Sequence, residues 1–439
     1  MNTIFLSAGL FCLANANNIP AWPMYRNNID KSGKSVNVTA QIDNSTLLFF
    51  VPSDSHGTTS SPVIGTANDG SDLIYFIDQC GAILAYGTST LSNQTNPAPY
   101  LWKYETADGC EQTFSPSISH DGSILMAATT KTVYSFNATS GKLLWFYEDP
   151  TSILFNGSPL ILEKYEIAFV ATIDDSTDGS CYVYGFDLGT GDIKKSYCFS
   201  DPTCPATELT FSYGYEDNVM WTGCNLDGSE PVIYRGHLDD NGADSFLGFG
   251  IDHNGPVIFV PDTSGDDVHD VVFQLSNGIL GGILTITGDQ SNLCKLETDY
   301  FQTMALVTLQ PKTRPDLNPP MIVTIDVIHN LALFVTPTPN PASTPLPANT
   351  PCLFNYSVNL NTLAPLSSLV IPTVDAIGNV FFPDQGGNVY VIEGPYYTGI
   401  KLIYSANSSQ PIFSNIVIGG QGRLYFTDFN GNIYGVGNP

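Results

Sequence analysis

The sequence predicts an all-β fold, namely a β-propeller of four-stranded blades. Helical periodicity is absent nearly throughout, while β-branched and aromatic residues alternate between Gly and Asn turns. One strand-and-turn unit also recurs, with starts about 43 to 64 residues apart, which is the spacing of propeller blades. Eight units fit best, and seven is the alternative. A sandwich or a jelly roll would not produce so regular a period.

The clearest unit runs from Ser115 to Trp145. A Ser-Pro start, two Gly turns and strands rich in Tyr and Phe mark it. Its predicted strands are Pro116 to Ser119, Ile124 to Thr129, Val133 to Phe136 and Lys142 to Tyr147. Similar signals begin units at Ser60, Ser158, Pro372 and Asn415, and more degenerate units lie near Phe211 to Tyr234, Gly250 to Ile286 and Met321 to Leu360.

One segment does not suit a blade. Residues 336–351, from Thr336 to Pro351, contain six prolines among Ser, Thr and Asn. Proline lacks the N–H that a strand ladder needs, so this segment is predicted to be an exposed loop insertion.

The N-terminus predicts export. Ile4 to Leu13 is apolar but too short to span a bilayer, and it ends in Ala14-Asn15-Ala16, a small-x-small cleavage signature. Residues 1–16 are therefore expected to be a signal peptide, and residues 17–439 a single secreted propeller domain. No later stretch reads as a membrane helix, and no lipidation motif is recognised.

The cysteines agree with an oxidising compartment. Eight remain after cleavage, an even number that indicates disulfides rather than metal binding, since no Cys-x-x-Cys pair occurs. Cys181 and Cys198 flank a hairpin that turns at Gly189-Thr190, so they should lie opposite each other and form a disulfide. The other pairs are expected between sequential neighbours: Cys80–Cys110, Cys204–Cys224 and Cys294–Cys352.

Glycosylation is expected on the same grounds. Seven Asn-x-Ser/Thr sequons in one exported chain indicate a eukaryotic secretory route. They begin at Asn37, Asn44, Asn93, Asn137, Asn156, Asn355 and Asn407, and Pro159 directly follows the one at Asn156.

The charge excludes some partners. The net charge is −27, charged residues make up 13% of the chain, and Lys and Arg total 15. So few cations cannot neutralise phosphates, which argues against nucleic acid and anionic membranes as partners.

The residues from Val133 to Trp145 read VYSFNATSGKLLW, which closely resembles the PQQ-like repeat of quinoprotein dehydrogenases and bacterial outer-membrane assembly propellers. The resemblance implies that Trp102 and Trp145 dock between neighbouring blades, with Lys195 where a third Trp would be expected. Ala21 to Asn28 resembles the opening segment of such propellers, which implies that the region around Trp22 to Arg26 closes the ring.

One loop resembles the calcium loop of FG-GAP repeats and the first part of an EF-hand. Oxygen atoms for a hard cation would come from Asp262, Ser264, Asp266 and Asp270 and from the Val268 carbonyl. Calcium is therefore the expected ion, and an acidic surface hairpin is the alternative.

Catalytic signals are scarce. The six histidines are scattered (His56, His120, His237, His253, His269 and His329), and no nucleophile elbow or His-Glu-x-x-His motif occurs. The quinone-dependent dehydrogenases that share this resemblance have two adjacent cysteines at the cofactor, and this sequence has no Cys-Cys pair. We therefore expect no PQQ and no enzyme activity. The expected role is an extracellular structural or interaction scaffold for proteins or glycans, with self-assembly included; the alternative is a divergent PQQ-dependent oxidoreductase.

Overall fold

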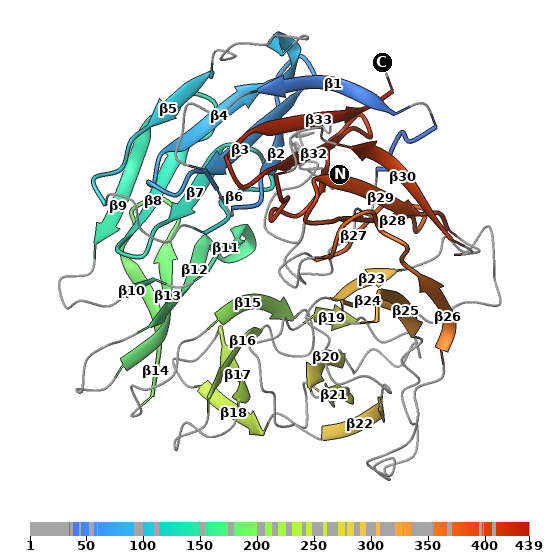
Figure 1. Ribbon diagram of the computed structural model, residues 1–439. Coiled ribbons are helices and arrows are strands. Elements are labelled where there is room, and N and C mark those ends of the chain that lie inside the picture. Colours follow the sequence, from blue (N-terminus) through green and yellow to red (C-terminus); the bar gives the residue numbers. More distant parts are fainter. Residues whose placement is uncertain are drawn as a thin grey trace, which may run out of the picture.

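The strands form antiparallel sheets that surround a common centre, as the computed structural model in Figure 1 shows. The structure describes residues 35–199 and 321–438 with internal gaps, chiefly 52–56, 92–99, 109–113, 149–153, 174–179, 336–353, 367–370 and 406–409, and mainly strand backbones between 207 and 307. Within these residues, no helix is long and apolar enough to cross a membrane. Neighbouring sheets contact each other mainly through their first strands, which lie nearest the centre.

Each sheet is numbered here in chain order, and its strands are given from the centre outward. Sheet 1 contains β2 (Val63–Thr66), β3 (Asp72–Ile77), β4 (Ile83–Gly87) and β5 (Trp102–Tyr104); sheet 2 contains β6 (Ser117–Ile118), β7 (Ile124–Ala128), β8 (Thr132–Asn137) and β9 (Leu143–Glu148). In sheet 3, β10 (Leu154–Phe155) and β11 (Leu160–Leu162) both pair with β12 (Ile167–Ile173), followed by β13 (Ser180–Asp187) and β14 (Ile193–Phe199). Short 3-10 turns, η1 (Thr88–Thr90) and η2 (Glu163–Tyr165), follow β4 and β11.

The remaining sheets repeat this order. Sheet 4 contains β15 (Thr207–Ser212), β16 (Asn218–Cys224), β17 (Pro231–His237) and β18 (Ala243–Leu247); sheet 5 contains β19 (Ile258–Val260), β20 (Val271–Ser276), β21 (Ile279–Leu284) and β22 (Gln290–Lys295). Sheet 6 contains β23 (Met304–Val307), β24 (Met321–Asp326), β25 (Leu331–Val335) and β26 (Phe354–Asn359); sheet 7 contains β27 (Thr373–Val374), β28 (Val380–Pro383), β29 (Asn388–Ile392) and β30 (Ile400–Ser405). Sheet 8 contains β31 (Val417–Ile418), β32 (Leu424–Thr427), β33 (Ile433–Gly437) and, outermost, β1 (Thr46–Val51). The all-β propeller prediction is confirmed, and eight sheets are described.

Tryptophans on outermost strands join sheets 1, 2 and 3. The indole N–H of Trp102 donates to the Ala138 carbonyl at 2.8 Å, and that of Trp145 donates to the Leu188 carbonyl at 2.9 Å. The glycine in each receiving turn has a positive φ, and a Cβ at Gly141 would lie 2.5 Å from the Trp102 ring. Only glycine therefore allows the indole to lie flat on the turn. The docking role that the repeat resemblance implies is confirmed for both tryptophans.

A tyrosine of sheet 3 also lies against a glycine of the next sheet. Lys195 of β14 stands where a third Trp was expected. Tyr197, further along β14, is fully buried, and a Cβ at Gly236 of β17 would lie 2.6 Å from its ring. An aromatic ring against a glycine thus recurs at this interface as well, at the strand position that Tyr147 holds in sheet 2, since Val133 pairs with Tyr147 and Val183 with Tyr197.

The N-terminal part of the described chain closes the ring. Backbone hydrogen bonds tie Ser35 and Val38 to sheet 7, and Gln41 to Gly422 of sheet 8. The chain then adds β1 as the outermost strand of sheet 8, antiparallel to β33. Closure by an N-terminal segment is confirmed. The described strand that provides it is β1; the region around Trp22 to Arg26 lies outside the described residues.

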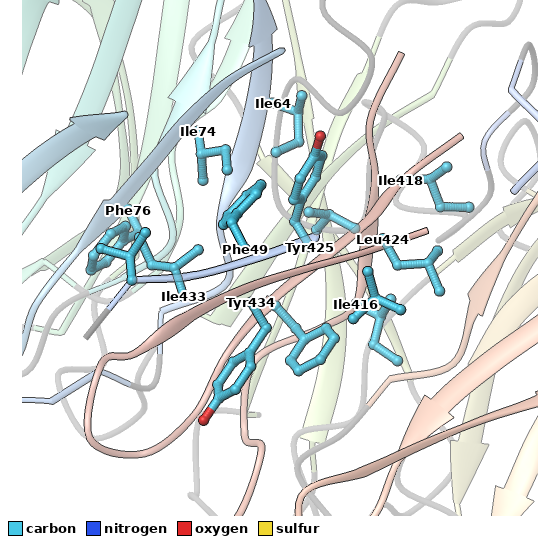
Figure 2. Packing of buried hydrophobic residues seen from close by; sticks show 14 of the residues in the cluster. Phe49, Ile64, Ile74, Phe76, Ile416, Ile418, Leu424, Tyr425, Ile433 and Tyr434 are labelled. Carbon is cyan, nitrogen blue, oxygen red and sulfur yellow. The ribbon is translucent and has the colours of Figure 1, made fainter. Parts of the chain in front are cut away.

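An apolar cluster fills the seam between sheets 8 and 1. Phe49 of β1 stacks on Tyr425 of β32, and Ile64 and Ile74 of sheet 1 belong to the same buried cluster. Figure 2 shows these side chains converging with Phe76 and Ile433. Residues from both ends of the described chain therefore share one hydrophobic core, so that neither sheet is complete without the other.

A buried carboxylate crosses this seam. Asp72 of sheet 1, with 1% of its surface exposed, accepts hydrogen bonds from the Tyr425 hydroxyl at 2.7 Å and from the Gly420 N–H at 2.8 Å. Burial raises the pKa of Asp72, although the hydrogen bonds from Tyr425 and Gly420 oppose that rise. Burial also raises the pKa of Tyr425.

We expect Trp145→Ala to lower the free energy of unfolding by about 3–5 kcal/mol, because it removes both a buried ring and the hydrogen bond to the next sheet. Trp145→Phe should cost less, since most of the apolar contact remains. Urea unfolding followed by circular dichroism measures both. Leu363→Ala, at a side chain that is 72% exposed, is the control and should be close to neutral. Equal stability of Trp145→Ala and the wild type would contradict the docking role.

We also expect a pH-dependent contribution from Asp72. Its pKa is raised in the folded state, so its favourable contribution is complete below the ordinary value of 3.8 and is lost as the pH rises through the raised pKa. The variant Asp72→Asn cannot lose this proton. Its stability relative to the wild type should therefore improve as the pH rises above 3.8 towards neutrality. Urea unfolding of both proteins across this range measures the difference, and a constant difference would contradict the assignment.

Candidate functional site

The first strands of the described sheets all begin at the same face of the ring. Because successive strands in a sheet are antiparallel, the turns between second and third strands lie at that same face. We call it the hub face. The turns between first and second strands, and those between third and fourth strands, lie at the opposite face.

A chain of hydrogen bonds links neighbouring sheets at the centre of the hub face. The Ile371 N–H donates to the Asn415 side-chain carbonyl at 3.3 Å, the Asn415 N–H donates to Ser61 Oγ at 2.9 Å, and the Ser61 N–H donates to Ser115 Oγ at 2.8 Å. This chain runs through sheets 7, 8, 1 and 2. Ser117 continues it by donating to the Pro159 carbonyl of sheet 3 at 2.6 Å. We call these linked residues the hub.

The hub is buried and neutral. Ser61, Ser115, Ser117 and Asn415 are each less than 7% exposed, and all four take part in hydrogen bonds within the protein. The pyrroloquinoline quinone of the resembled dehydrogenases carries carboxylates, which need cations or several free donors. The described hub offers neither, so its residues do not fit that quinone.

Carboxylates organise the turns on the hub face. Asp384 accepts hydrogen bonds from the N–H groups of Gly386 and Asn388 and from the Tyr390 hydroxyl at 2.9 Å. Asp428 does the same in sheet 8, where Tyr434 donates at 2.8 Å. Such fully bonded carboxylates are structural, since they replace the water that the turn amides would otherwise need.

In sheet 2 the equivalent carboxylate belongs to a residue outside the turn. Its corresponding turn has Thr129 in place of the aspartate, and Asp108, from the segment before β6, accepts from the hydroxyls of Thr129, Thr132 and Tyr134 at 2.6 to 3.0 Å. The tyrosine–carboxylate contact of sheets 7 and 8 is therefore kept although its aspartate has moved. Asp108 is therefore a structural residue, because its carboxylate accepts the hydroxyl groups of this turn and strand.

The corresponding turn of sheet 6 differs because it carries a histidine. His329 Nδ1 lies 2.7 Å from Asp326 Oδ2, and the His329 N–H donates to Asp326 Oδ1 at 3.0 Å. The Asp326 side chain is 1% exposed, whereas that of His329 is 56% exposed. A positive φ at Asn330 allows the chain to turn back into β25 directly after the histidine.

This geometry defines a proton acceptor. The Asp326 carboxylate can only accept a hydrogen bond when ionised, so Nδ1 carries the proton and Nε2 is left as the basic nitrogen. A buried carboxylate that orients an exposed imidazole is the arrangement used in general base catalysis. The Asp326–His329 dyad is thus the described group on the hub face with the clearest chemical capacity.

Sequence reasoning missed this dyad. It treated His329 as one of six scattered histidines and named no catalytic residue. The sequence did contain a signal for it, namely an aspartate three residues before a histidine at a turn between two strands. At such turns an Asp side chain commonly accepts a hydrogen bond from a backbone N–H a few residues later. Within the described residues, no group of three or more His, Cys, Asp or Glu side chains could hold a metal ion.

Most residues of the predicted calcium and glycan sites lie outside the described residues. The loop from Asp262 to Asp270 falls between β19 and β20, outside the described residues. Asn355 is a strand residue of β26. The Asn137 side chain accepts from the N–H of Ser140 at 2.9 Å and so shapes the turn that receives Trp102. The sequons at Asn37, Asn44, Asn93, Asn156 and Asn407 lie outside the described residues.

The backbone register bears on one predicted disulfide. Cys181 of β13 lies directly opposite Cys198 of β14, which is the placement that the hairpin argument predicts. Cys224 and Cys294 are strand residues of β16 and β22, whereas Cys110, Cys204 and Cys352 lie outside the described residues.

The fold is that of a PQQ-like β-propeller. A europium-containing methanol dehydrogenase matches 94% of this chain over 90% of its own length, with a TM-score of 0.62 and 11% sequence identity. BamB from Moraxella catarrhalis matches 90% of this chain over 98% of its own length, with a TM-score of 0.55 and 14% identity. At these identities the likeness shows the fold. No protein-family model and no curated protein matches the sequence.

These comparisons correct the functional expectation. The sequence interpretation was a secreted scaffold that is not an enzyme, on the grounds that quinone-site signals are missing. A dehydrogenase that matches nearly the whole chain contradicts this interpretation and favours the oxidoreductase alternative. The argument failed because it looked for the adjacent cysteines of one group of enzymes, while the ring itself accommodates different sites.

Proposed function

We propose that the chain is a divergent oxidoreductase of the quinoprotein-propeller class that oxidises small hydroxyl compounds, with His329 as proton acceptor. The observation that carries this proposal is the Asp326–His329 dyad, which exposes a basic nitrogen on the hub face. The match to a methanol dehydrogenase over 94% of the chain supports the reaction class.

The proposed step concerns the proton alone. Oxidation of an alcohol to an aldehyde removes the hydroxyl proton and transfers a hydride from the adjacent carbon to an acceptor. His329 Nε2 would take the proton, and Asp326 would stabilise the resulting imidazolium, as a buried carboxylate partner does in other dyads. The hydride passes to an external two-electron acceptor, an electron-accepting dye in the assay below, and no step involves the quinone, because the hub residues do not fit it.

The test is reduction of an electron-accepting dye by the purified full chain with methanol or larger primary alcohols, with and without added quinone and calcium. We expect turnover that His329→Asn lowers by about 10²- to 10⁴-fold, the usual loss when a general base is removed.

Two controls separate chemistry from structure. His120→Asn, at an exposed histidine on the opposite face, should leave turnover unchanged. Asp384→Asn alters a structural turn carboxylate, so it should lower the unfolding midpoint more than the rate of the folded protein. Absence of turnover with every alcohol and acceptor would overturn the proposal.

The likeness to BamB and an exposed aromatic pair favour a second candidate, the binding of a partner protein. Phe429 is 42% exposed on a hub-face turn and lies edge-on to Phe413, with ring centroids 5.6 Å apart. Exposed aromatic rings of this kind commonly anchor partners.

We also propose the cellular features that the sequence indicates. These are a signal peptide at residues 1–16, a single secreted domain at 17–439, a calcium ion in the loop from Asp262 to Asp270, N-glycans and disulfide bonds. The cysteine count and sequons support them, as does the disulfide-bonded state of Cys80.

The disulfide between Cys181 and Cys198 is the most direct of these features to test, because the two residues lie opposite in register. Peptide mapping of the secreted protein without reduction should recover one cross-linked peptide that contains both. Recovery of either cysteine joined to a different sheet would contradict the proposal. Removal of this bond should cost about 2–4 kcal/mol of stability.

A further inference from the structure

The turn that carries the dyad lacks a contact that the next two sheets make. In sheet 7 the Tyr390 hydroxyl donates to Asp384 Oδ2 at 2.9 Å. In sheet 8 the Tyr434 hydroxyl donates to Asp428 Oδ2 at 2.8 Å. The equivalent position in sheet 6 holds Leu333, whose side chain has no hydroxyl to donate.

The register of the second and third strands establishes this equivalence. Tyr390 lies opposite Phe382, two residues before the turn aspartate of sheet 7. In the same way, Leu333 lies opposite Thr324, two residues before Asp326. Leu333 is buried, with 4% of its surface exposed. It therefore takes the place of the tyrosine inside the sheet.

The turn of sheet 6 is also one residue longer than that of sheet 7. Four residues separate Asp326 from its pairing partner Leu331. In sheet 7 three residues separate Asp384 from Asn388, whose carbonyl accepts the Asp384 N–H at 2.9 Å. Within the longer turn, His329 Nδ1 lies 2.7 Å from Asp326 Oδ2. The carboxylate oxygen that bonds a tyrosine in sheets 7 and 8 thus bonds a histidine in sheet 6.

We propose that Leu333 is a positioning residue of the dyad, because a leucine at this place leaves Asp326 Oδ2 to His329. This inference rests on the proposed function, in which His329 accepts the proton. A tyrosine here would donate from inside the sheet, whereas the imidazole is 56% exposed and can exchange its bond for one with water. The tyrosine would therefore compete for the oxygen and weaken the preference for a proton on Nδ1.

Sheet 1 shows that a leucine at this position does not create a dyad by itself. Leu84 lies opposite Phe76, two residues before Asp78. The Asp78 carboxylate accepts hydrogen bonds from the N–H groups of Cys80 and Ala82, and the turn contains no histidine. The leucine is thus the permissive residue, and the histidine provides the chemistry.

Sheet 6 has room for the tyrosine that tests this role. The residue opposite Leu333 is Thr324, where sheet 7 has the larger Phe382. Sheet 2 already combines a tyrosine at this position with a small opposite residue, since Tyr134 lies opposite Ala127. We therefore expect Leu333→Tyr to fold.

The test measures the tautomer of His329 in the full chain, labelled with nitrogen-15 at histidine. Long-range proton–nitrogen correlation spectra are recorded at about pH 9, where imidazoles are neutral, and the signals of His329 are those that His329→Asn removes. In the wild type the proton should lie on Nδ1. Leu333→Tyr should lower the ratio of Nδ1–H to Nε2–H by about three- to tenfold, which is the usual worth of one hydrogen bond. Dye-linked turnover should fall with the Nδ1–H population.

Two further variants separate the hydroxyl from the added volume. Leu333→Phe adds the ring without the hydroxyl and should keep the wild-type tautomer ratio. Leu333→Gln adds an amide donor to a side chain close to leucine in volume, so it should shift the ratio in the same direction as Leu333→Tyr. Thermal unfolding of each variant checks that the fold is retained.

The matched control is Leu84→Tyr, which makes the same change beside Asp78 in sheet 1 and should leave the His329 tautomer and turnover unchanged. Equal shifts in Leu333→Tyr and Leu333→Phe would overturn the proposal, as would a wild-type ratio in both donor variants. Absence of turnover together with the expected tautomer ratios would instead refute the proposed function, while supporting Leu333 as the residue that orients the imidazole.

Discussion

The closure of the ring is the constraint on which the rest of the structure depends. Sheets in a propeller stabilise one another through their side faces, so an open ring would leave two apolar faces in water. Here β1 completes sheet 8, and Asp72 of sheet 1 bonds Tyr425 of sheet 8. Closure therefore combines a strand pairing at the periphery, a buried carboxylate between the sheets and the hub bonds at the centre. Sheets 8 and 1 are thus held together at three distances from the centre of the ring.

The repeat unit keeps interactions rather than residues. A carboxylate that accepts a tyrosine hydroxyl occurs in sheets 7 and 8 within the turn, and in sheet 2 from Asp108 in the preceding segment. An aromatic ring docks on a glycine whether it is Trp102, Trp145 or Tyr197. Such replacements keep buried polar groups bonded and inter-sheet gaps filled, which explains why the repeat is weak in sequence and regular in structure.

The fold could be predicted from the sequence because its signals are local. Gly turns, alternating apolar residues and the pattern from Val133 to Trp145 report on hairpins, and the hairpin from Cys181 to Cys198 has the predicted register. The substitute Asp108 could not be predicted, because its role is defined by contacts with hydroxyls 21 to 26 residues later in the chain. The pairing of β1 with β33 was also beyond reach, since it joins segments far apart in the sequence.

The candidate site was missed because a dyad is a property of three-dimensional placement. Asp326 and His329 are close in sequence, yet only the fold makes one buried and the other exposed, and that asymmetry gives the imidazole a fixed direction. The neutral hub beside it explains how function could diverge on this ring. When hydroxyl and amide groups at the centre serve to join sheets, they are no longer free to bind an anionic cofactor. The proposed chemistry therefore rests on a turn of the hub face, where a histidine after a structural aspartate adds an exposed basic nitrogen.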